Sequence, residues 1–270
     1  MAIMTKEQFQ DSIRAREPMN VWFLGEKIED LTTFPVLSAS FNAVSKVYEL
    51  HNHPDWEDLL TVESDLNGEK VSIYNAPLRS PEDANRKTRA ARALAEVIGC
   101  CTHRCTGSEA FAGLGPCTYD MDQDLGTDYF KRFTNFIDYV QKNDLSCTVT
   151  VTDVKGLRTL PPHKQPNRDN YIHIDEIRED GIIISGFKCN QTGILFAHEI
   201  IIIPTTNMKP EDEDFALACA IPADAPNITY VLGRTPQDKR FFEVGGDIEG
   251  IDLGKKYADH QALVYFDKVF

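Results

Sequence analysis

Apolar residues recur at helical intervals along the first half of the chain. Thr5 and Gln8 have the form of a capping box, and Phe9 and Ile13 follow it about one turn apart. The strongest helix signal is an alanine-rich segment that begins at Ser80, a good capping residue followed by proline and two acids. Beyond the first helix, the pattern predicts helices over residues 39–52, 55–60, 80–105 and 128–141.

The pattern changes after Asn143 and Asp144. Short segments rich in β-branched residues then alternate with turn residues such as Gly181 and Pro204. Strands are predicted over residues 147–152, 171–177, 181–187, 199–203, 215–221, 228–232 and 262–266. Short strands at such close spacing are typical of a sandwich or barrel. We therefore predict a helical part up to about residue 145 and a β-rich part after it.

Composition and charge exclude several classes of protein. At 270 residues and 42% hydrophobic content, the chain can bury one or two sizeable cores. A net charge of −14 argues against a nucleic-acid partner. The apolar runs are too short for a membrane span, and the first residues do not resemble a secretory signal. Seven cysteines, an odd number that falls largely in predicted helices and strands, indicate a reducing, cytoplasmic location.

Cys101 and Cys105 form the sharpest chemical feature. A spacing of four places both sulfurs on one face of the predicted helix, which suits two thiolates on one metal or on neighbouring irons of a cluster. His103 and Arg104, which lie between them, favour the thiolate form. Two ligands do not complete a four-ligand site. The alternative is that both cysteines are small residues in helix packing.

Two strand-end turns are candidate cofactor contacts. Residues 152–158 offer backbone amides and hydroxyls, and residues 191–193 place a threonine beside a glycine that permits close backbone approach. His198 and Glu199 form a candidate acid–base pair. The structural alternatives are ordinary turns and a buried histidine with satisfied hydrogen bonds.

A group of cations stands out in this acidic chain: Arg79, Arg86, Lys87, Arg89, Arg92 and Arg104. Such a group can receive an anionic ligand. The alternative is a solvated helix face that balances nearby acids.

Read in order, these pieces resemble the 4-hydroxybutyryl-CoA dehydratase/vinylacetyl-CoA isomerase family and, more loosely, the wider 4-hydroxyphenylacetate 3-hydroxylase family. The likeness is nearly collinear along the whole chain. It is carried by Phe23-Leu24-Gly25-Glu26, Tyr48-Glu49-Leu50, Cys101 and Cys105, Gly126-Thr127-Asp128-Tyr129, Asn143-Asp144-Leu145, Thr152-Asp153-Val154-Lys155-Gly156-Leu157-Arg158, Arg178-Glu179-Asp180-Gly181-Ile182, Gln191-Thr192-Gly193, His198-Glu199 and Asp252-Leu253-Gly254.

The resemblance implies an α+β fold like that of acyl-CoA dehydrogenases. Residues 1–145 would form an N-terminal helical domain and residues 146–270 a middle antiparallel β-barrel that binds flavin, while the C-terminal helical bundle is missing. Cys101 and Cys105 would be two of the four ligands of a [4Fe-4S] cluster, the other two coming from the bundle. The FAD contacts implied are Thr152, Asp153, Lys155, Arg158, Gln191 and Thr192.

The implied function is part of an FAD- and [4Fe-4S]-dependent acyl-CoA dehydratase or isomerase. A second polypeptide would supply the bundle in a homo- or hetero-oligomer, and the substrate would be an acyl-CoA or another small molecule. Two departures from the family pattern are Gln261, where the dehydratases have Glu, and His103, where we expect Gln. The alternatives are a reduced-flavin-dependent phenol hydroxylase component and a non-catalytic, degenerate subunit.

Overall fold

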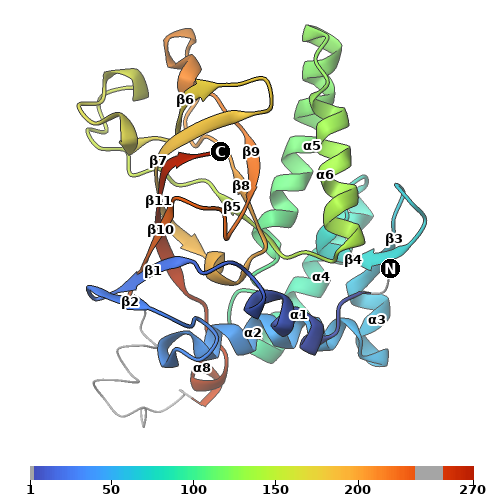
Figure 1. The fold of residues 1–270 in the computed structure, drawn as a ribbon. Helices are drawn as coiled ribbons and strands as arrows, with labels where there is room; N and C mark the ends of the chain where they lie inside the picture. Colours follow the sequence, from blue (N-terminus) through green and yellow to red (C-terminus); the bar gives the residue numbers. More distant parts are fainter. Residues whose placement is uncertain (1–2, 235–251) are drawn as a thin grey trace.

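The computed structural model describes residues 3–234 and 252–270 (Figure 1). Its helices are α1 (Lys6–Arg14), α2 (Pro35–His51), α3 (Pro54–Leu60), α4 (Pro81–Ile98), α5 (Cys105–Leu125), α6 (Tyr129–Lys142) and α8 (Asp252–Lys256). Its strands are β1 (Asn20–Phe23), β2 (Glu26–Ile28), β3 (Thr61–Glu63), β4 (Lys70–Ser72), β5 (Cys147–Thr150), β6 (His173–Ile177), β7 (Ile182–Thr192), β8 (Glu199–Ile202), β9 (Cys219–Pro222), β10 (Ile228–Leu232) and β11 (Gln261–Val269). Short 3-10 helices lie between them: η1 (Ile73–Asn75), η2 (Pro162–Lys164), η3 (Arg168–Asn170), η4 (Ile194–Phe196) and η5 (Pro210–Phe215).

The first helix begins as its sequence predicts. The Thr5 hydroxyl accepts the Gln8 backbone N–H at 3.2 Å, and the Gln8 side chain accepts the Thr5 N–H at 2.8 Å. This capping box satisfies two N–H groups that have no partner within the helix. The apolar face of α1 then packs on α2, where Phe9 stacks on Tyr48 with ring centroids 4.2 Å apart.

The helix predicted over residues 80–105 is wrong at its end. α4 starts after the Ser80 cap, but it stops at Ile98 because Gly99 takes a left-handed φ of 65°. A loop follows, and α5 starts only at Cys105. The sequence pattern did not reveal α5 because its glycines and Pro116 lower the helix propensity of the segment.

α5 and α6 run side by side and extend beyond the sheets (Figure 1). Asp122 joins them by accepting the backbone N–H groups of Tyr129 at 2.8 Å and Phe130 at 3.0 Å. At its other end α5 lies directly on β5. A Cβ added at Gly107 would lie only 2.4 Å from the carbonyl oxygen of Cys147. Glycine is therefore what permits this close approach.

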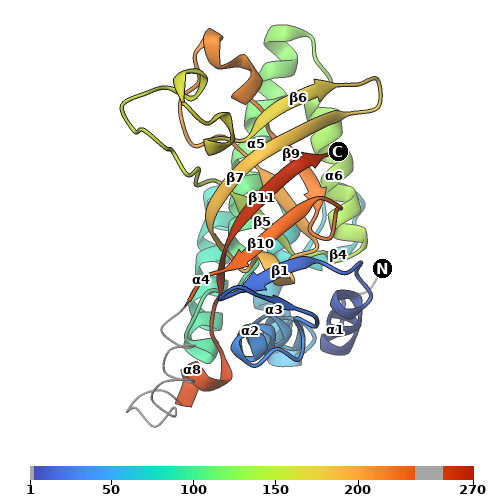
Figure 2. The same cartoon turned by 60° about the vertical axis from the view of Figure 1, so that its left-hand side comes forward.

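The strands of the described residues form three sheets. The largest has the order β2-β1-β10-β11-β7-β6, the second β5-β8-β9, and the third is the hairpin of β3 and β4. β1 and β2 come from the first half of the chain, and β1 pairs in parallel with β10. Figure 2 shows the six-stranded sheet in front, with α5 and α6 behind it.

The predicted β-barrel is therefore wrong, although the mixture of helices and strands is as predicted. β2 and β6 are the two edges of the large sheet and do not pair with each other, so the sheet does not close. The β1–β2 hairpin, which was not predicted, occupies the edge beside β10. The second sheet meets the large one at a bridge between Asp153 and Lys188. The strand predicted over residues 215–221 begins only at Cys219.

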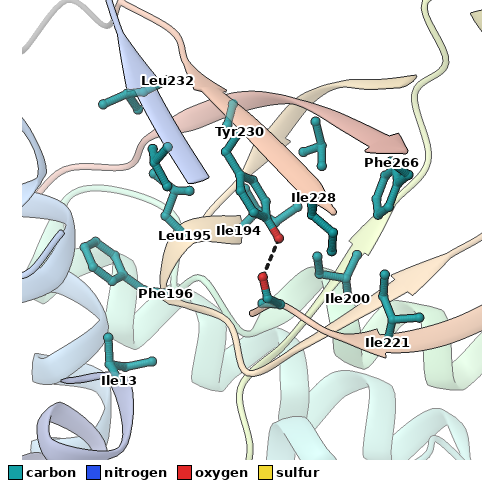
Figure 3. Packing of buried hydrophobic residues seen from close by; sticks show 14 of the residues in the cluster. Ile13, Ile194, Leu195, Phe196, Ile200, Ile221, Ile228, Tyr230, Leu232 and Phe266 are labelled. Atoms are coloured by element: carbon teal, nitrogen blue, oxygen red, sulfur yellow. Dashed lines mark hydrogen bonds between the residues drawn. The ribbon is translucent and has the colours of Figure 1, made fainter. Parts of the chain in front are cut away.

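The main apolar core lies between the two larger sheets and the first two helices. Figure 3 labels Ile13, Ile194, Leu195, Phe196, Ile200, Ile221, Ile228, Tyr230, Leu232 and Phe266. Within this core the Tyr230 hydroxyl donates to the Ala223 carbonyl at 2.6 Å. Because α1 and α2 share the core with strands, the two halves of the chain fold against each other.

The division of the chain into two domains at residue 145 and the likeness of its fold to acyl-CoA dehydrogenases remain predictions.

Across the described ranges, no helix combines the length and apolarity needed to cross a membrane.

Replacing Gly107 by Ala is expected to lower the free energy of unfolding by about 2–4 kcal/mol, because the added methyl meets backbone atoms of β5 that cannot move aside. Gly113→Ala, in the same helix, is the matched control. A Cβ at Gly113 meets nothing within 4 Å, so this variant should gain up to about 1 kcal/mol from helix propensity. Urea denaturation measures both, and equal effects would contradict the close approach of α5 to β5.

Candidate functional site

Cys101 and Cys105 meet, although not on one helix. Cys101 lies in the loop after α4, Cys105 is the first residue of α5, and His103 between them has a φ of 60°. The left-handed residue turns the loop back, so the two Sγ atoms lie 3.4 Å apart. The predicted placement on one helical face is wrong, but the two thiols are neighbours.

Both thiols are half-buried and interact directly. Their hydrogen bond lowers the pKa of Cys105 to about 6 and, together with burial, raises the pKa of Cys101 well above its usual value. The two sulfurs are hydrogen-bonded to each other, and either can be the donor. The His103 backbone N–H also points at Cys101 Sγ, at 3.4 Å. Two adjacent sulfurs of this kind are suited to a soft metal ion, which binds cysteines as thiolates.

A buried ion pair anchors this loop. Arg104 Nη2 lies 2.7 Å from Asp144 Oδ1, and the two side chains are only 1% and 4% exposed. The guanidinium carbon lies 4.5 Å from the centroid of the Tyr48 ring. Asp144 accepts further hydrogen bonds from the Asn75 side chain and the Met4 backbone, each at 3.1 Å. These contacts offset the desolvation of both charges.

His103 joins the cysteine loop to the turn at residues 191–193. Its Nε2–H donates to the Ala258 carbonyl at 3.2 Å, and its ring stacks on His260 with centroids 5.8 Å apart. A Cβ at Gly193 would lie 2.7 Å from His103 Nδ1. Gly193 also has a φ of 74°. Both its conformation and this contact therefore favour glycine.

A second connection runs through Thr148 of β5. Its hydroxyl lies 3.4 Å from the hydroxyl of Thr106, which follows the second cysteine, and donates to the Thr192 carbonyl at 3.3 Å. Gln191 is buried, and its side chain donates to the backbone of β7. Gln261 pairs directly opposite Thr192 and is exposed. The structure thus brings together the cysteine pair, the Thr192 turn and Gln261, which are far apart in sequence.

The other predicted cofactor segment, residues 152–158, lies beyond the far end of β5. The Thr152 carbonyl accepts a hydrogen bond from β7. Asp153 is buried in an ion pair with Lys188 at 2.6 Å, and Lys188 Nζ donates to two carbonyls as well. This pair therefore holds the two larger sheets together. Lys155 adopts a φ of 70°, and Arg158 is exposed.

Both ring nitrogens of His198 have hydrogen-bond partners within the protein. This arrangement matches the structural alternative to an acid–base role. His198 Nδ1 accepts the Ser146 N–H at 3.0 Å, and its Nε2 hydrogen-bonds the Ser12 hydroxyl at 2.8 Å. Burial lowers the pKa of His198 to about 3. Burial also raises the pKa of Glu199 to about 7, although Glu199 accepts a hydrogen bond from Tyr139 at 3.2 Å.

The cations of the 79–104 segment are mostly engaged by the protein itself. Those with protein partners are Arg79, Arg86, Lys87, Arg92 and Arg104. The structure therefore favours a helix face balanced by its surroundings over a binding site for an anion.

Comparison with known proteins decides the family. A family model described as "4-hydroxyphenylacetate 3-hydroxylase N terminal" matches residues 5–270. The chain belongs to the 4-hydroxyphenylacetate 3-hydroxylase family. It is 39% identical over 269 residues to the 4-hydroxybutyryl-CoA dehydratase/vinylacetyl-CoA-Δ-isomerase of Clostridium aminobutyricum, a match that covers 99% of this chain and 54% of that protein. The resemblance carried by the sequence motifs is confirmed.

Two solved structures share the fold. An oxygen-tolerant 4-hydroxybutyryl-CoA dehydratase from N. maritimus has a TM-score of 0.93 at 33% identity, covering 100% of this chain and 53% of that one. The oxygenase component of 4-hydroxyphenylacetate 3-monooxygenase, solved in complex with FAD, has a TM-score of 0.76 at 24% identity, with coverages of 99% and 53%. The chain spans about half the length of the curated relatives it matches.

Glu199→Gln is expected to flatten the pH dependence of stability. The pKa of Glu199 is raised from 4.5 to about 7 in the folded protein, so the folded state keeps the proton longer than the unfolded state. The free energy of unfolding therefore falls as pH rises from about 4.5 to 7, by on the order of 2 kcal/mol, and the variant lacks this fall. Urea denaturation between pH 4.5 and 8 measures it, with exposed Glu179→Gln as control. Parallel curves for wild type and Glu199→Gln would contradict the assignment.

Proposed function

We propose that this chain forms the N-terminal and middle parts, residues 1–145 and 146–270, of an FAD- and [4Fe-4S]-dependent enzyme of the acyl-CoA dehydratase or isomerase type. A second polypeptide would supply the C-terminal helical bundle, in a homo- or hetero-oligomer. The observation that carries the proposal is the pair of sulfurs, 3.4 Å apart, beside the Thr192 turn. This pair of sulfurs would let the chain bind a metal centre next to a flavin held at the Thr192 turn.

The cysteine loop fits the proposed cluster in its donor chemistry. Cys101 and Cys105 are half-buried neighbours that hydrogen-bond to each other, and soft thiolates are the usual ligands of iron–sulfur centres. The N–H of His103 directed at sulfur is the kind of hydrogen bond that tunes such a centre. Among the described residues no group of three or more metal-ligating side chains occurs. We therefore assign the remaining two ligands to the second polypeptide.

The flavin contacts that we propose are Thr152, Asp153, Lys155, Arg158, Gln191 and Thr192. Thr192 stands next to Gly193, where the absence of a Cβ makes room for the His103 ring. Lys155 and Arg158 would meet the anionic part of the cofactor. Asp153 would act indirectly, because its ion pair with Lys188 holds the start of the 152–158 turn. The FAD complex of the oxygenase component with this fold supports a flavin here.

When bound, the flavin would exchange electrons with the substrate's carbon skeleton, and a cluster iron would act as Lewis acid. This chain's contribution is to position both groups, since the His103–Gly193 contact and the Thr148 hydroxyl fix the cysteine loop against the Thr192 turn. Gln261 lies opposite Thr192. The side-chain amide of Gln261 can form hydrogen bonds with an adjacent group. It cannot accept a proton as a carboxylate does. A proton acceptor for the reaction would therefore lie elsewhere.

The second candidate is a reduced-flavin-dependent phenol hydroxylase component, since an oxygenase component has the same fold. It needs no cysteine ligands, and the juxtaposed thiols therefore favour the first proposal. A non-catalytic subunit, the third alternative, would bind no flavin.

Anaerobic purification of the tagged chain with its partners tests the proposal. We expect FAD together with iron and sulfide, and cluster absorbance that Cys101→Ala or Cys105→Ala abolishes because each change removes a ligand. Cys117→Ala is the matched control, since Cys117 is exposed on α5. Flavin without iron, with phenol hydroxylation that survives both cysteine changes, would instead support the hydroxylase. Neither cofactor would indicate the non-catalytic subunit.

A further inference from the structure

The two sulfurs of the cysteine loop are close enough to react with each other. The Sγ atoms of Cys101 and Cys105 lie 3.4 Å apart and are hydrogen-bonded. The sulfurs of a disulfide lie about 2.05 Å apart. A bond between the two therefore requires them to approach each other by only about 1.4 Å.

The two cysteines nearest in sequence cannot take the place of either partner. Cys100 adjoins Cys101, and the Cα atoms of neighbouring residues lie about 3.8 Å apart, which is below the usual range of a disulfide. The Cys100 thiol instead donates to the Cys101 carbonyl, with sulfur and oxygen 3.6 Å apart. Cys117 lies about 18 Å along the axis of α5 from Cys105. The geometry thus selects Cys101 and Cys105 as partners.

The loop permits the small movement that bond formation needs. Cys105 is the first residue of α5 and directly follows Arg104, which is fixed by its buried ion pair with Asp144. Cys101 lies in the loop before the helix. Its sulfur contacts the Cys105 sulfur and accepts the His103 N–H, each at 3.4 Å. Rotation of the Cys101 side chain can therefore close the gap while the ion pair stays intact.

A small oxidant such as hydrogen peroxide can reach the pair, because both cysteines are half-buried and neither is fully enclosed. One sulfur attacks a peroxide oxygen, the O–O bond breaks and water leaves, which makes that cysteine a sulfenic acid. The second sulfur then attacks the first, the S–O bond breaks, and the hydroxyl leaves as water with the second thiol's proton. The two thiols together lose two electrons and two protons, and the peroxide is reduced to two waters.

We propose that Cys101 and Cys105 form a reversible disulfide with peroxide when no metal is bound, and that this bond closes the site to metal. Cysteine binds metals as thiolate, which a disulfide does not offer. The bond also protects both sulfurs from the irreversible sulfinic and sulfonic acids. The closing of the site rests on the proposed function, since it takes the two cysteines as metal ligands. The bond itself needs only their juxtaposition.

Mass spectrometry of the chain, purified with its partners and stripped of metal by chelation, tests the bond. After peroxide treatment, we expect trypsin to release two peptides that are joined through Cys101 and Cys105, because the enzyme cleaves after Arg104. Dithiothreitol should separate them. Cys117→Ala is the matched control and should form the same cross-link, since Cys117 is exposed and lies outside the pair. In Cys101→Ala, Cys105 lacks its partner and should advance to sulfinic acid, which dithiothreitol does not reverse.

Cobalt(II) added to the same preparation tests the closing of the site. Thiolate-to-cobalt charge-transfer absorption reports binding through sulfur, and Cys105→Ala identifies the part of it that depends on the cysteine loop. We expect this part in the reduced protein, its complete loss after peroxide treatment, and its return once dithiothreitol has been added and removed. Cys117→Ala should show the same loss and the same return.

Two results would overturn the inference while leaving the proposed function in place. One is the absence of a cross-link between Cys101 and Cys105 under peroxide that oxidises the exposed Cys117, whether the pair stays as thiols or becomes sulfinic acid. The other is undiminished cobalt absorption in the cross-linked protein. A reduced protein with no absorption that depends on Cys105 would overturn the proposed function and the closing of the site together, even where the cross-link forms.

Discussion

The buried pair of Arg104 and Asp144 is the interaction on which the rest of the site depends. Arg104 directly precedes Cys105 and α5, and Asp144 stands between α6 and β5. Removing one partner would leave an uncompensated buried charge, at a cost of about 3–5 kcal/mol. The pair therefore fixes where the cysteine loop meets the first strand of the β-rich half, and the contacts of Thr148 and His103 follow from that position.

Once the loop is held there, the local backbone and neighbouring residues set the positions of its two sulfurs and of the His103 ring. A left-handed residue at His103 brings the two sulfurs together, and a glycine at position 193 lets the His103 ring lie against the Thr192 turn. Two segments separated by some 90 residues thereby form one site. Among the described residues no group of three or more metal-ligating side chains occurs, and the chain spans about half the length of its curated relatives.

Local signals in the sequence predicted much of the secondary structure. The capping box at Thr5 and the cap at Ser80 were read correctly because they depend on neighbouring residues alone. α5 was not predicted, since its glycines and Pro116 disfavour a helix that tertiary packing nevertheless stabilises. The barrel was wrong because alternation reveals a strand but not its partner, and the β1–β2 hairpin takes an edge position that no local pattern indicates.

The sequence nominated the candidate residues of the site, but it did not indicate how they are arranged. Spacing alone left Cys101 and Cys105 as either ligands or packing residues, and motif resemblance selected the cofactor segments. The contact of His103 with Gly193 and the pairing of Gln261 with Thr192 join residues distant in sequence. Such contacts depend on the folded arrangement, which a single sequence does not encode in any local pattern.

We propose that the two sulfurs of the 101–105 loop bind iron together. X-ray absorption at the iron edge of the anaerobically purified complex tests it most directly. We expect iron with sulfur as its nearest neighbours, and loss of that sulfur shell when Cys105 is replaced by alanine. Iron surrounded only by nitrogen and oxygen, or a flavin-loaded complex with no iron and both thiols free, would contradict it.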